Sequence, residues 1–260
     1  MSNPQAYIHP DAKIGNNVKI DPFAYVDSDV VIGDNTWLGP HTTILKGSRI
    51  GANCKIFPGA VIGAIPQDLK FAGEYTTVEI GDNTTIREAV TVNRGTAAKG
   101  KTVVGNNVLL MACAHVGHDT IIGNNVIVAN AVLFGGEVIV DDFAIIGGAS
   151  ALHQFVHVGA HTMLAGGSLV GKDIPPYVKA GRFPVSYCGI NSIGLRRRSF
   201  SNDTIQEVQD IYRVIFMNGL NTTDAIEFIE TEMAASKERD EILMFVKNSK
   251  RGIMKGYFSQ

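Results

Sequence analysis

A large apolar residue recurs at every sixth position over two long stretches of the chain. The first stretch runs from Ile8 to Ile62 and the second from Val104 to Val170. An α-helix repeats about every 3.6 residues and a strand every two, so neither element alone produces this period. The position four residues later is small or β-branched in the first stretch, namely Ala12, Val18, Ala24, Val30, Thr36, Thr42, Ser48, Cys54 and Ala60. This pattern predicts stacked units that share one continuous core.

A six-residue unit of this kind is typical of a parallel β-helix, in which three units form one triangular coil. Residues eighteen positions apart would then lie above one another, about 4.8 Å apart in neighbouring coils. Glycine often follows the large apolar residue, at Gly15, Gly33, Gly51, Gly63, Gly81, Gly105 and Gly123. We expect these glycines to supply corner conformations that are closed to residues with a Cβ atom. Parallel crossover connections are usually right-handed, which favours a right-handed coil, and the period alone does not overturn that preference.

Two stretches interrupt the period, at about residues 64–78 and 93–103. Each spans a multiple of six residues between aliphatic positions, so the spacing fits both a replaced coil and an extended one. We expect both stretches to leave the prism as loops. Long loops on a compact scaffold frequently carry function, which makes these two stretches candidate binding segments.

The six-residue period stops after Pro176, and beyond Asn191 the apolar residues follow helical spacing. One helix is predicted behind Ser201 and ends at Gly219, a second begins near Thr222 or Thr223, and a third carries Ile242, Leu243, Phe245 and Val246. The sequence therefore predicts a hexapeptide-repeat β-helix over residues 1–190 and a helical domain over residues 191–260. Because solenoids need a cap at an open end, we expect the helices to provide it.

Composition narrows the class of protein. The formal net charge is −2, which gives no support to broad binding of nucleic acid or of a membrane surface. Cys54, Cys113 and Cys188 are widely spaced and match no zinc pattern, which fits a reducing compartment. The chain has neither the basic and apolar regions of a secretory signal nor an apolar run long enough for a membrane span, so we expect a cytoplasmic protein without an integral membrane segment.

Most of the seven histidines are expected to be solvated residues at corners, and these are His9, His41, His157 and His161. His153, His157 and His161 are spaced four apart, which on a helix would suggest a metal-binding face. In a six-residue repeat they point in three different directions. We therefore predict no metal site.

His118 differs from these histidines because of the residues expected above it. Adding eighteen twice gives Gly136 and then Gln154. A column of a histidine, a bare backbone N–H and a side-chain amide can supply a base, an oxyanion donor and a substrate anchor. A hydrogen-bonded surface column without function fits the same spacing.

The absence of other motifs limits the chemistry of such a site. The chain has no GxSxG elbow, P-loop or GxGxxG motif, and no cysteine has an obvious base partner, so a covalent mechanism is disfavoured. A neutral imidazole can remove a proton from a hydroxyl or amine that attacks an activated acyl group. Direct acyl transfer from a thioester suits His118. Asp119 could orient the ring, but neighbours in a strand point to opposite faces, so adjacency alone supports this role weakly.

Several motifs together resemble the UDP-N-acetylglucosamine O-acyltransferase family, whose members catalyse the first step of lipid A synthesis. The motifs are Gln67-Asp68-Leu69-Lys70, Arg94-Gly95-Thr96, His115-Val116-Gly117-His118-Asp119, Asp142-Phe143-Ala144-Ile145-Ile146-Gly147-Gly148, His153-Gln154-Phe155 and Asp173-Ile174-Pro175-Pro176-Tyr177. The resemblance extends into the tail, through Asn191 and Gly194-Leu195-Arg196-Arg197-Arg198. It therefore covers essentially the whole chain.

The resemblance implies a left-handed β-helix, a homotrimer with sites at subunit interfaces, and no cofactor. His118 would be the general base that deprotonates the sugar 3-hydroxyl of UDP-N-acetylglucosamine, and Gly136 would supply the oxyanion N–H. The donor would be a 3-hydroxyacyl chain on the phosphopantetheine of acyl carrier protein. The implied substrate-binding residues are Asp68, Lys70, His115, His153 and Gln154, with Asn191, Arg197 and Arg198 contacting nucleotide or phosphopantetheine. Gly166 falls where the family sets acyl-chain length, and a glycine leaves room for a long chain.

The sequence departs from the family pattern at Glu137 and Ile193, where a histidine and an acidic residue are usual, and at Arg182-Phe183-Pro184. Other hexapeptide acyltransferases, including the later N-acyltransferase of the pathway, remain alternatives, as does an amino-sugar acceptor. A γ-class carbonic anhydrase needs a different histidine spacing. A structural or ice-binding solenoid would show regular threonine ladders and no irregular loops.

Overall fold

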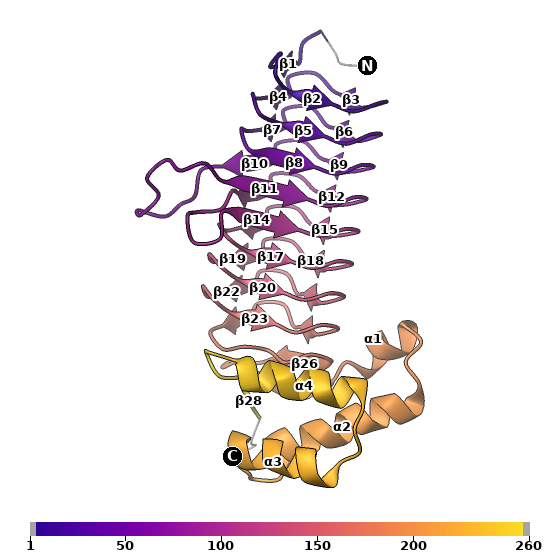
Figure 1. Cartoon of the computed structure of the whole chain (residues 1–260). Coiled ribbons are helices and arrows are strands. Elements are labelled where there is room, and N and C mark those ends of the chain that lie inside the picture. Colours follow the sequence, from indigo (N-terminus) through magenta and orange to yellow (C-terminus); the bar gives the residue numbers. More distant parts are fainter. Residues whose placement is uncertain (1–3, 257–260) are drawn as a thin grey trace.

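Stacked coils of short strands form a long triangular prism, and helices cover one end of it (Figure 1). This computed structural model describes residues 4–256, so the first three and last four residues of the two predicted domains lie outside it. Each coil passes through three sheets in turn, which we call sheets 1, 2 and 3. The turns between them are named corners 1–2, 2–3 and 3–1. The fold is a left-handed parallel β-helix followed by a helical region, as the family resemblance implied.

The described strands of each sheet follow the coil order. Sheet 1 contains β1 (Tyr7–Ile8), β4 (Tyr25–Val26), β7 (Thr43–Ile44), β10 (Val61–Ala64), β13 (Thr91–Asn93), β16 (His115–Val116), β19 (Leu133–Phe134), β22 (Ala151–Leu152) and β25 (Leu169–Val170). Sheet 2 contains β2 (Lys13–Ile14), β5 (Val31–Ile32), β8 (Ser48–Ile50), β11 (Thr77–Ile80), β14 (Lys101–Val104), β17 (Ile121–Ile122), β20 (Ile139–Val140) and β23 (His157–Val158). Sheet 3 contains β3 (Lys19–Ile20), β6 (Trp37–Leu38), β9 (Lys55–Ile56), β12 (Thr85–Ile86), β15 (Leu109–Leu110), β18 (Ile127–Val128), β21 (Ile145–Ile146), β24 (Met163–Leu164), β26 (Val178–Gly181), β27 (Ser186–Ile190) and β28 (Lys255–Gly256).

The strand register confirms the eighteen-residue coil. Val116 pairs with Phe134, and Phe134 pairs with Leu152. The apolar series fills the inside of the prism, where most of its members are less than 5% exposed. Ile8 and Ile14, at the N-terminal end, are only partly buried. The period in the sequence therefore predicted both the coil length and the core.

The expected role of the glycines is wrong at every predicted position except Gly63, whose φ is +85°. The left-handed corner conformation belongs instead to the third residue after the apolar position, such as Asn17 or Asn35. Asparagine tolerates this conformation because its short side chain can form local hydrogen bonds. Glycine is needed for close approach, since a Cβ on Gly33 would lie 2.6 Å from the backbone nitrogen of Ala52 in the next coil.

Both interruptions extend a coil. Ile50 pairs with Ile80, thirty residues away, and Ile80 pairs with Val104, twenty-four residues away. Residues 65–76, the first loop, connect β10 to β11, and residues 94–100, the second loop, connect β13 to β14. Both loops leave the prism at corner 1–2 (Figure 1).

The two loops also contact each other. Glu74 Oε1 in the first loop accepts a hydrogen bond from the backbone N–H of Ala97 in the second loop at 3.0 Å. The guanidinium of Arg94 lies over the ring of Phe71, 5.5 Å from its centroid. These contacts make the loops one connected layer beside corner 1–2.

The C-terminal end is more elaborate than predicted. The helices are α1 (Ser192–Arg197), α2 (Asn202–Met217), α3 (Thr222–Glu232) and α4 (Lys237–Asn248), and the last three match the predicted positions. The Ser201 side chain caps α2 by accepting a hydrogen bond from the Thr204 N–H at 3.0 Å. The antiparallel β26–β27 pair and β28 were not predicted. Leu164 pairs with Ala180 only sixteen residues away, so the last coil breaks the period.

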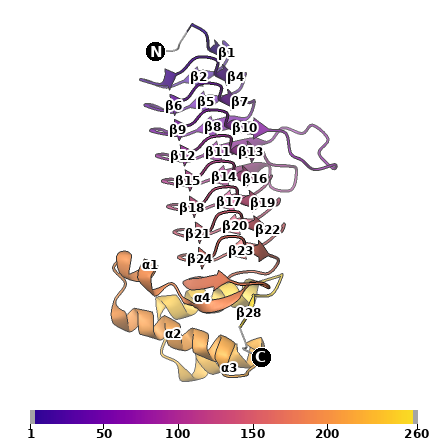
Figure 2. The same ribbon diagram turned by 180° about the vertical axis from the view of Figure 1, so that it is seen from behind.

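Hydrogen bonds fasten the helices onto the last coils, which confirms the expected cap (Figure 2). Tyr177 Oη donates to Glu241 Oε2 of α4 at 2.5 Å, and Tyr212 Oη of α2 donates to the Pro176 carbonyl at 2.6 Å. The carboxylate of Asp173, which is 3% exposed, accepts from the His157 N–H and from the Ser249 hydroxyl. The open end of the prism is therefore covered by residues of the same chain.

His161 is not the solvated corner residue that the sequence suggested. Its ring is stacked between Phe143 and Tyr177, with centroid distances of 4.9 and 5.5 Å. Burial lowers the pKa of His161 from 6.5 to about 4, and the charge of Arg198 acts in the same direction. The folded protein therefore holds this ring neutral.

We expect this stack to make stability depend on pH. The unfolded chain takes up a proton at His161 near pH 6.5 and the folded chain only near pH 4, so the stability that the neutral ring contributes is lost as pH falls between these values. A His161→Phe variant keeps the stack and should lose less stability from pH 7 to pH 5. Urea unfolding at both pH values measures the difference. An equal loss in the two proteins would contradict the assignment.

Candidate active site

His118, Gly136 and Gln154 form one column at corner 1–2, as predicted from the period. The strand pairs just before them are in register, and the Glu137 N–H donates to the His118 carbonyl at 2.8 Å. A Cβ placed on Gly136 would lie 2.4 Å from both Nε2 and Cε1 of His118. The imidazole therefore lies directly on the backbone of Gly136. Only a residue without a side chain leaves that space.

Asp119 contacts the ring of His118, contrary to the expectation that neighbouring side chains diverge. His118 Nδ1 lies 2.9 Å from Asp119 Oδ2. The strand β16 ends at Val116, so both residues belong to the corner, where Asp119 has a φ of +59°. This left-handed backbone brings the two side chains together. The Asp119 side chain is 0% exposed and that of His118 is 12% exposed.

Thr96 of the second loop supplies the other hydrogen bonds to the Asp119 carboxylate. Its hydroxyl donates to Oδ2 at 2.6 Å, and its N–H donates to Oδ1 and Oδ2 at 3.0 and 3.1 Å. A carboxylate that receives these donors is an acceptor, so Nδ1–H of His118 donates to it. In the neutral ring Nε2 then carries the lone pair and can accept a proton.

The backbone N–H of Gly136 makes no hydrogen bond to any residue that the structure describes. At corner 2–3, by contrast, the corresponding backbone N–H groups donate hydrogen bonds to side chains of the next coil. The Asn106 N–H donates to Asn124 Oδ1 at 2.9 Å, and the Asn124 N–H donates to Asp142 Oδ1 at 2.7 Å. A free amide donor beside Nε2 is suited to stabilise an oxyanion.

The other predicted residues near this corner come from sheet 1, the turn after it and the first loop. His115 lies on the outer face of sheet 1, where its Nδ1 is 2.7 Å from Thr91 Oγ1 and burial lowers its pKa. His153 is exposed, and its Nδ1 lies 3.0 Å from the Gln154 carbonyl. Asp68 and Lys70 lie together in the first loop, where Asp68 Oδ1 accepts from the Lys70 N–H at 2.9 Å.

The remaining predicted residues lie elsewhere on the chain. Asn191 Nδ2 donates to the His161 carbonyl at 2.9 Å, and the Arg198 guanidinium donates to the Phe143 carbonyl at 3.0 Å, both at corner 2–3. Arg197 is exposed on α1. Gly166 lies between β24 and β25, at corner 3–1. One chain therefore does not bring all of the predicted residues together.

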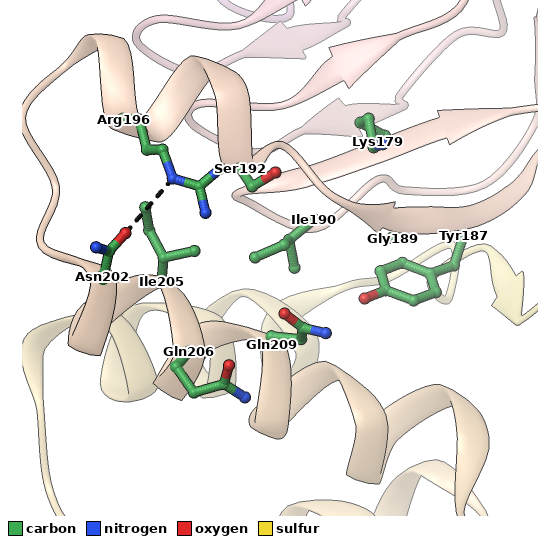
Figure 3. A pocket seen from close by; sticks show the side chains of 10 residues that line it. All are labelled: Lys179, Tyr187, Gly189, Ile190, Ser192, Arg196, Asn202, Ile205, Gln206 and Gln209. Carbon is green, nitrogen blue, oxygen red and sulfur yellow. Dashed lines mark hydrogen bonds between the residues drawn. The ribbon is translucent and has the colours of Figure 1, made fainter.

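A hollow of about 500 Å³ lies between the β26–β27 strands and helices α1 and α2 (Figure 3). Lys179 and Arg196 line it, and Arg196 Nε donates to Asn202 Oδ1 at 3.4 Å. None of its lining residues belongs to the predicted site. Within residues 4–256, no group of three or more His, Cys, Asp or Glu side chains is placed to hold a metal ion. In the same range, none of the helices has both the length and the apolar character needed to span a membrane.

The contact of Thr96 with Asp119 was not predicted from the sequence. Arg94-Gly95-Thr96 was noted only as part of a resemblance, because nothing in the period connects a loop residue to Asp119, twenty-three positions later. One signal was available in the sequence, namely the interruption of the six-residue period at about residues 93–103. It occurs at the same corner as the predicted column of His118, Gly136 and Gln154.

Comparisons with known proteins agree on one family. A model described as UDP-N-acetylglucosamine O-acyltransferase, domain 2, matches residues 173–254, and a bacterial transferase hexapeptide model matches residues 29–64 and 101–136. The acyl-[acyl-carrier-protein]–UDP-N-acetylglucosamine O-acyltransferase of Chlorobaculum parvum is 51% identical over 96% of this chain and 95% of its own length. The counterpart from Myxococcus xanthus is 43% identical over 96% and 98%. The structure of a UDP-N-acetylglucosamine acyltransferase from Bacteroides fragilis superimposes with a TM-score of 0.97 at 58% identity, covering 98% of this chain and 100% of that one.

We expect a Gly136→Ala substitution to displace the His118 imidazole from its position against residue 136. The added methyl group would lie 2.4 Å from Nε2 and Cε1, so the ring must rotate outward and leave Asp119. A crystal structure of the variant should show Nδ1 and Oδ2 beyond hydrogen-bond distance. Gly148→Ala is the control, because its nearest neighbour, the Asn130 carbonyl, lies 3.2 Å away. A ring that keeps its 2.9 Å contact in the Gly136 variant would refute the steric argument.

Proposed function

The chain belongs to the UDP-N-acetylglucosamine O-acyltransferase family, and on that premise we propose that it transfers a (R)-3-hydroxyacyl group from acyl carrier protein to the 3-hydroxyl of UDP-N-acetylglucosamine. This reaction is the first step of lipid A synthesis, and we place it in the cytoplasm. The observation that carries the proposal is the His118–Asp119 pair, with Nε2 packed against Gly136, whose N–H makes no hydrogen bond to the described residues. An acyl-transfer assay with UDP-N-acetylglucosamine and carrier-bound acyl chains of graded length tests it.

The proposed mechanism is direct attack assisted by a general base. Nε2 of His118 accepts the proton of the sugar 3-hydroxyl as its oxygen attacks the thioester carbonyl carbon. The Gly136 N–H donates to the oxyanion of the tetrahedral intermediate. When the C–S bond breaks, the phosphopantetheine sulfur leaves and takes the proton from the imidazolium. Asp119 stabilises the positive ring between these two steps.

Substrate binding is proposed for the residues around corner 1–2. Asp68, Lys70 and His115 would contact the nucleotide sugar, and the Lys70 ammonium suits its diphosphate. His153 and Gln154 both lie two coils beyond His118 along the same corner. The first loop and the sheet 1 face would thus enclose the acceptor on either side of His118.

A closed homotrimer would complete the site. Asn191, Arg197 and Arg198 lie on the corner 2–3 side and Gly166 lies at corner 3–1, so they can act with His118 only if another copy supplies them. The outer faces of the prism expose large apolar side chains, including Leu133 at 51% and Leu169 at 60%. Exposed apolar patches on a stable scaffold are typical of protein interfaces.

Gly166 is proposed to set the length of the acyl chain. Gly166 is exposed in a single chain, and a Cβ on it would meet the Gly148 carbonyl at 3.0 Å. Glu137, which replaces the usual histidine, has a φ of +59° beside the oxyanion glycine. Ile193, which replaces the usual acidic residue, is 64% exposed. We expect donor and nucleotide contacts to differ from those of relatives at these two positions.

We expect His118→Ala to lower kcat by about 10²- to 10⁴-fold, the usual contribution of a general base. Fold and trimer formation should be unchanged, because the ring lies on the outside of the corner. Steady-state kinetics and light scattering measure both. His41→Ala, at a distant corner, is the control and should keep normal turnover. Near-normal activity of the His118 variant would remove the proposed base.

We expect Gly166→Met to shift preference toward shorter acyl donors, because the side chain occupies space that the glycine leaves open. The ratio of kcat/KM for long and short carrier-bound chains measures the shift. Gly171→Met is a matched control, since a Cβ there meets nothing within 4 Å. An unchanged chain-length profile in the Gly166 variant would contradict the proposed role of Gly166 in setting acyl-chain length.

A further inference from the structure

The second loop places one buried threonine against the Asp119 carboxylate. Thr96 is 7% exposed, and it provides every hydrogen bond that the described residues donate to this carboxylate apart from that of His118. Its hydroxyl makes the shortest of these contacts, 2.6 Å to Oδ2, the oxygen that also faces Nδ1 of His118. The orientation of the carboxylate therefore depends on this residue.

The loop is built to hold Thr96 in place. A Cβ on Gly95 would lie 2.3 Å from the Lys101 nitrogen, so only glycine lets the loop fold back onto β14. The Gly100 N–H donates to the Thr96 carbonyl at 2.7 Å, and the Ala98 N–H donates to the Thr96 hydroxyl at 3.2 Å. Because the Ala98 N–H donates to the Thr96 hydroxyl oxygen, the hydroxyl proton is directed toward Asp119. Glu74 then joins the first loop to the next residue, Ala97.

We propose that Thr96 is a positioning residue for the reaction, which holds Asp119 in the rotamer that fixes the ring and tautomer of His118. The inference rests on the proposed function, because it needs His118 as the base. Without the hydroxyl, Oδ2 loses its closest donor and the carboxylate is free to turn toward the Thr96 N–H alone. The imidazole then loses the partner that keeps hydrogen on Nδ1 and the lone pair on Nε2, and the wrong tautomer cannot accept the proton.

The assignment also explains why the second coil extension exists. The six extra residues add no strand and no core residue, since β13, β14 and the strands below them keep their register. Their described hydrogen bonds to the next coil end on Asp119, through Thr96 and through Lys99 Nζ, which donates to the Asp119 carbonyl at 3.3 Å. The extension thus serves the catalytic corner.

The kinetic test compares three variants. Thr96→Val keeps the shape but removes the hydroxyl, and we expect kcat to fall about 10- to 100-fold, as for loss of a hydrogen bond to a charged group. KM for both substrates should change less than about threefold, because Thr96 is buried and is not among the proposed substrate contacts. Thr96→Ser should restore most of kcat. Thr36→Val is the matched control, since its buried hydroxyl donates to the Gly51 carbonyl at 2.9 Å at corner 2–3, and it should leave kcat unchanged.

A double-mutant cycle separates positioning from a general structural effect. If Thr96 acts through Asp119, Thr96→Val should cause no further loss of kcat in an Asp119→Ala background. The same fold loss in both backgrounds would overturn the inference. So would a loss of kcat in the Thr36 control as large as that in Thr96→Val, or a variant whose KM rises while kcat is kept.

A spectroscopic arm keeps the inference separate from the proposed activity. In ¹⁵N-histidine-labelled protein, His118, assigned by its absence in His118→Ala, should show protonated Nδ1 in the wild type and a mixture of tautomers in Thr96→Val. An unchanged His118 signal in the variant overturns the role of Thr96 even if transfer is normal. A wild type that transfers no acyl group defeats the proposed function, while the tautomer shift still reports the contact.

Discussion

Backbone hydrogen bonding between successive coils is the constraint on which the rest of the structure depends. The His115 N–H donates to the Val132 carbonyl at 2.9 Å, and equivalent bonds repeat along every face of the prism. For these bonds to form, each coil must present its corner at the same place as the coil before. The apolar residue, the close glycine and the left-handed third position are the local means of doing so. As a result, corner residues eighteen apart become fixed neighbours, which is how Gly136 lies beneath the His118 ring.

The same constraint decides where the chain can vary. Extra residues are tolerated only where they leave the prism between two strands, so both extensions occur at a corner and the columns continue past them. At corner 1–2 the extensions fold against each other and against Asp119 through Glu74, Ala97 and Thr96. The column alone places the His118 ring against Gly136. The loops supply the polar contacts to Asp119, and those contacts have no period.

This division explains what the sequence could predict. The six-residue period predicted the core, the coil length and the His118–Gly136–Gln154 column, because all three follow from stacking. Local capping signals predicted the later helices, beginning with Ser201. Handedness came only from resemblance, since the period fits either hand. The contact between Asp119 and His118 was not expected, because the period marks strands but not where each one ends. The sixteen-residue step into β26 was missed because it breaks the repeat.

A prism held at this register also limits how an active site can form. Its three corners point away from one another, and the hydrogen bonds between successive coils fix the position of corner 1–2. In one chain, His118 therefore lies at corner 1–2. Asn191 and Arg198, which the family resemblance assigns to nucleotide or phosphopantetheine, lie at corner 2–3, and Gly166, assigned to the acyl chain, lies at corner 3–1. In the proposed homotrimer, side-by-side packing of copies would bring unlike corners together without bending any coil. Assembly would then take the place of closure.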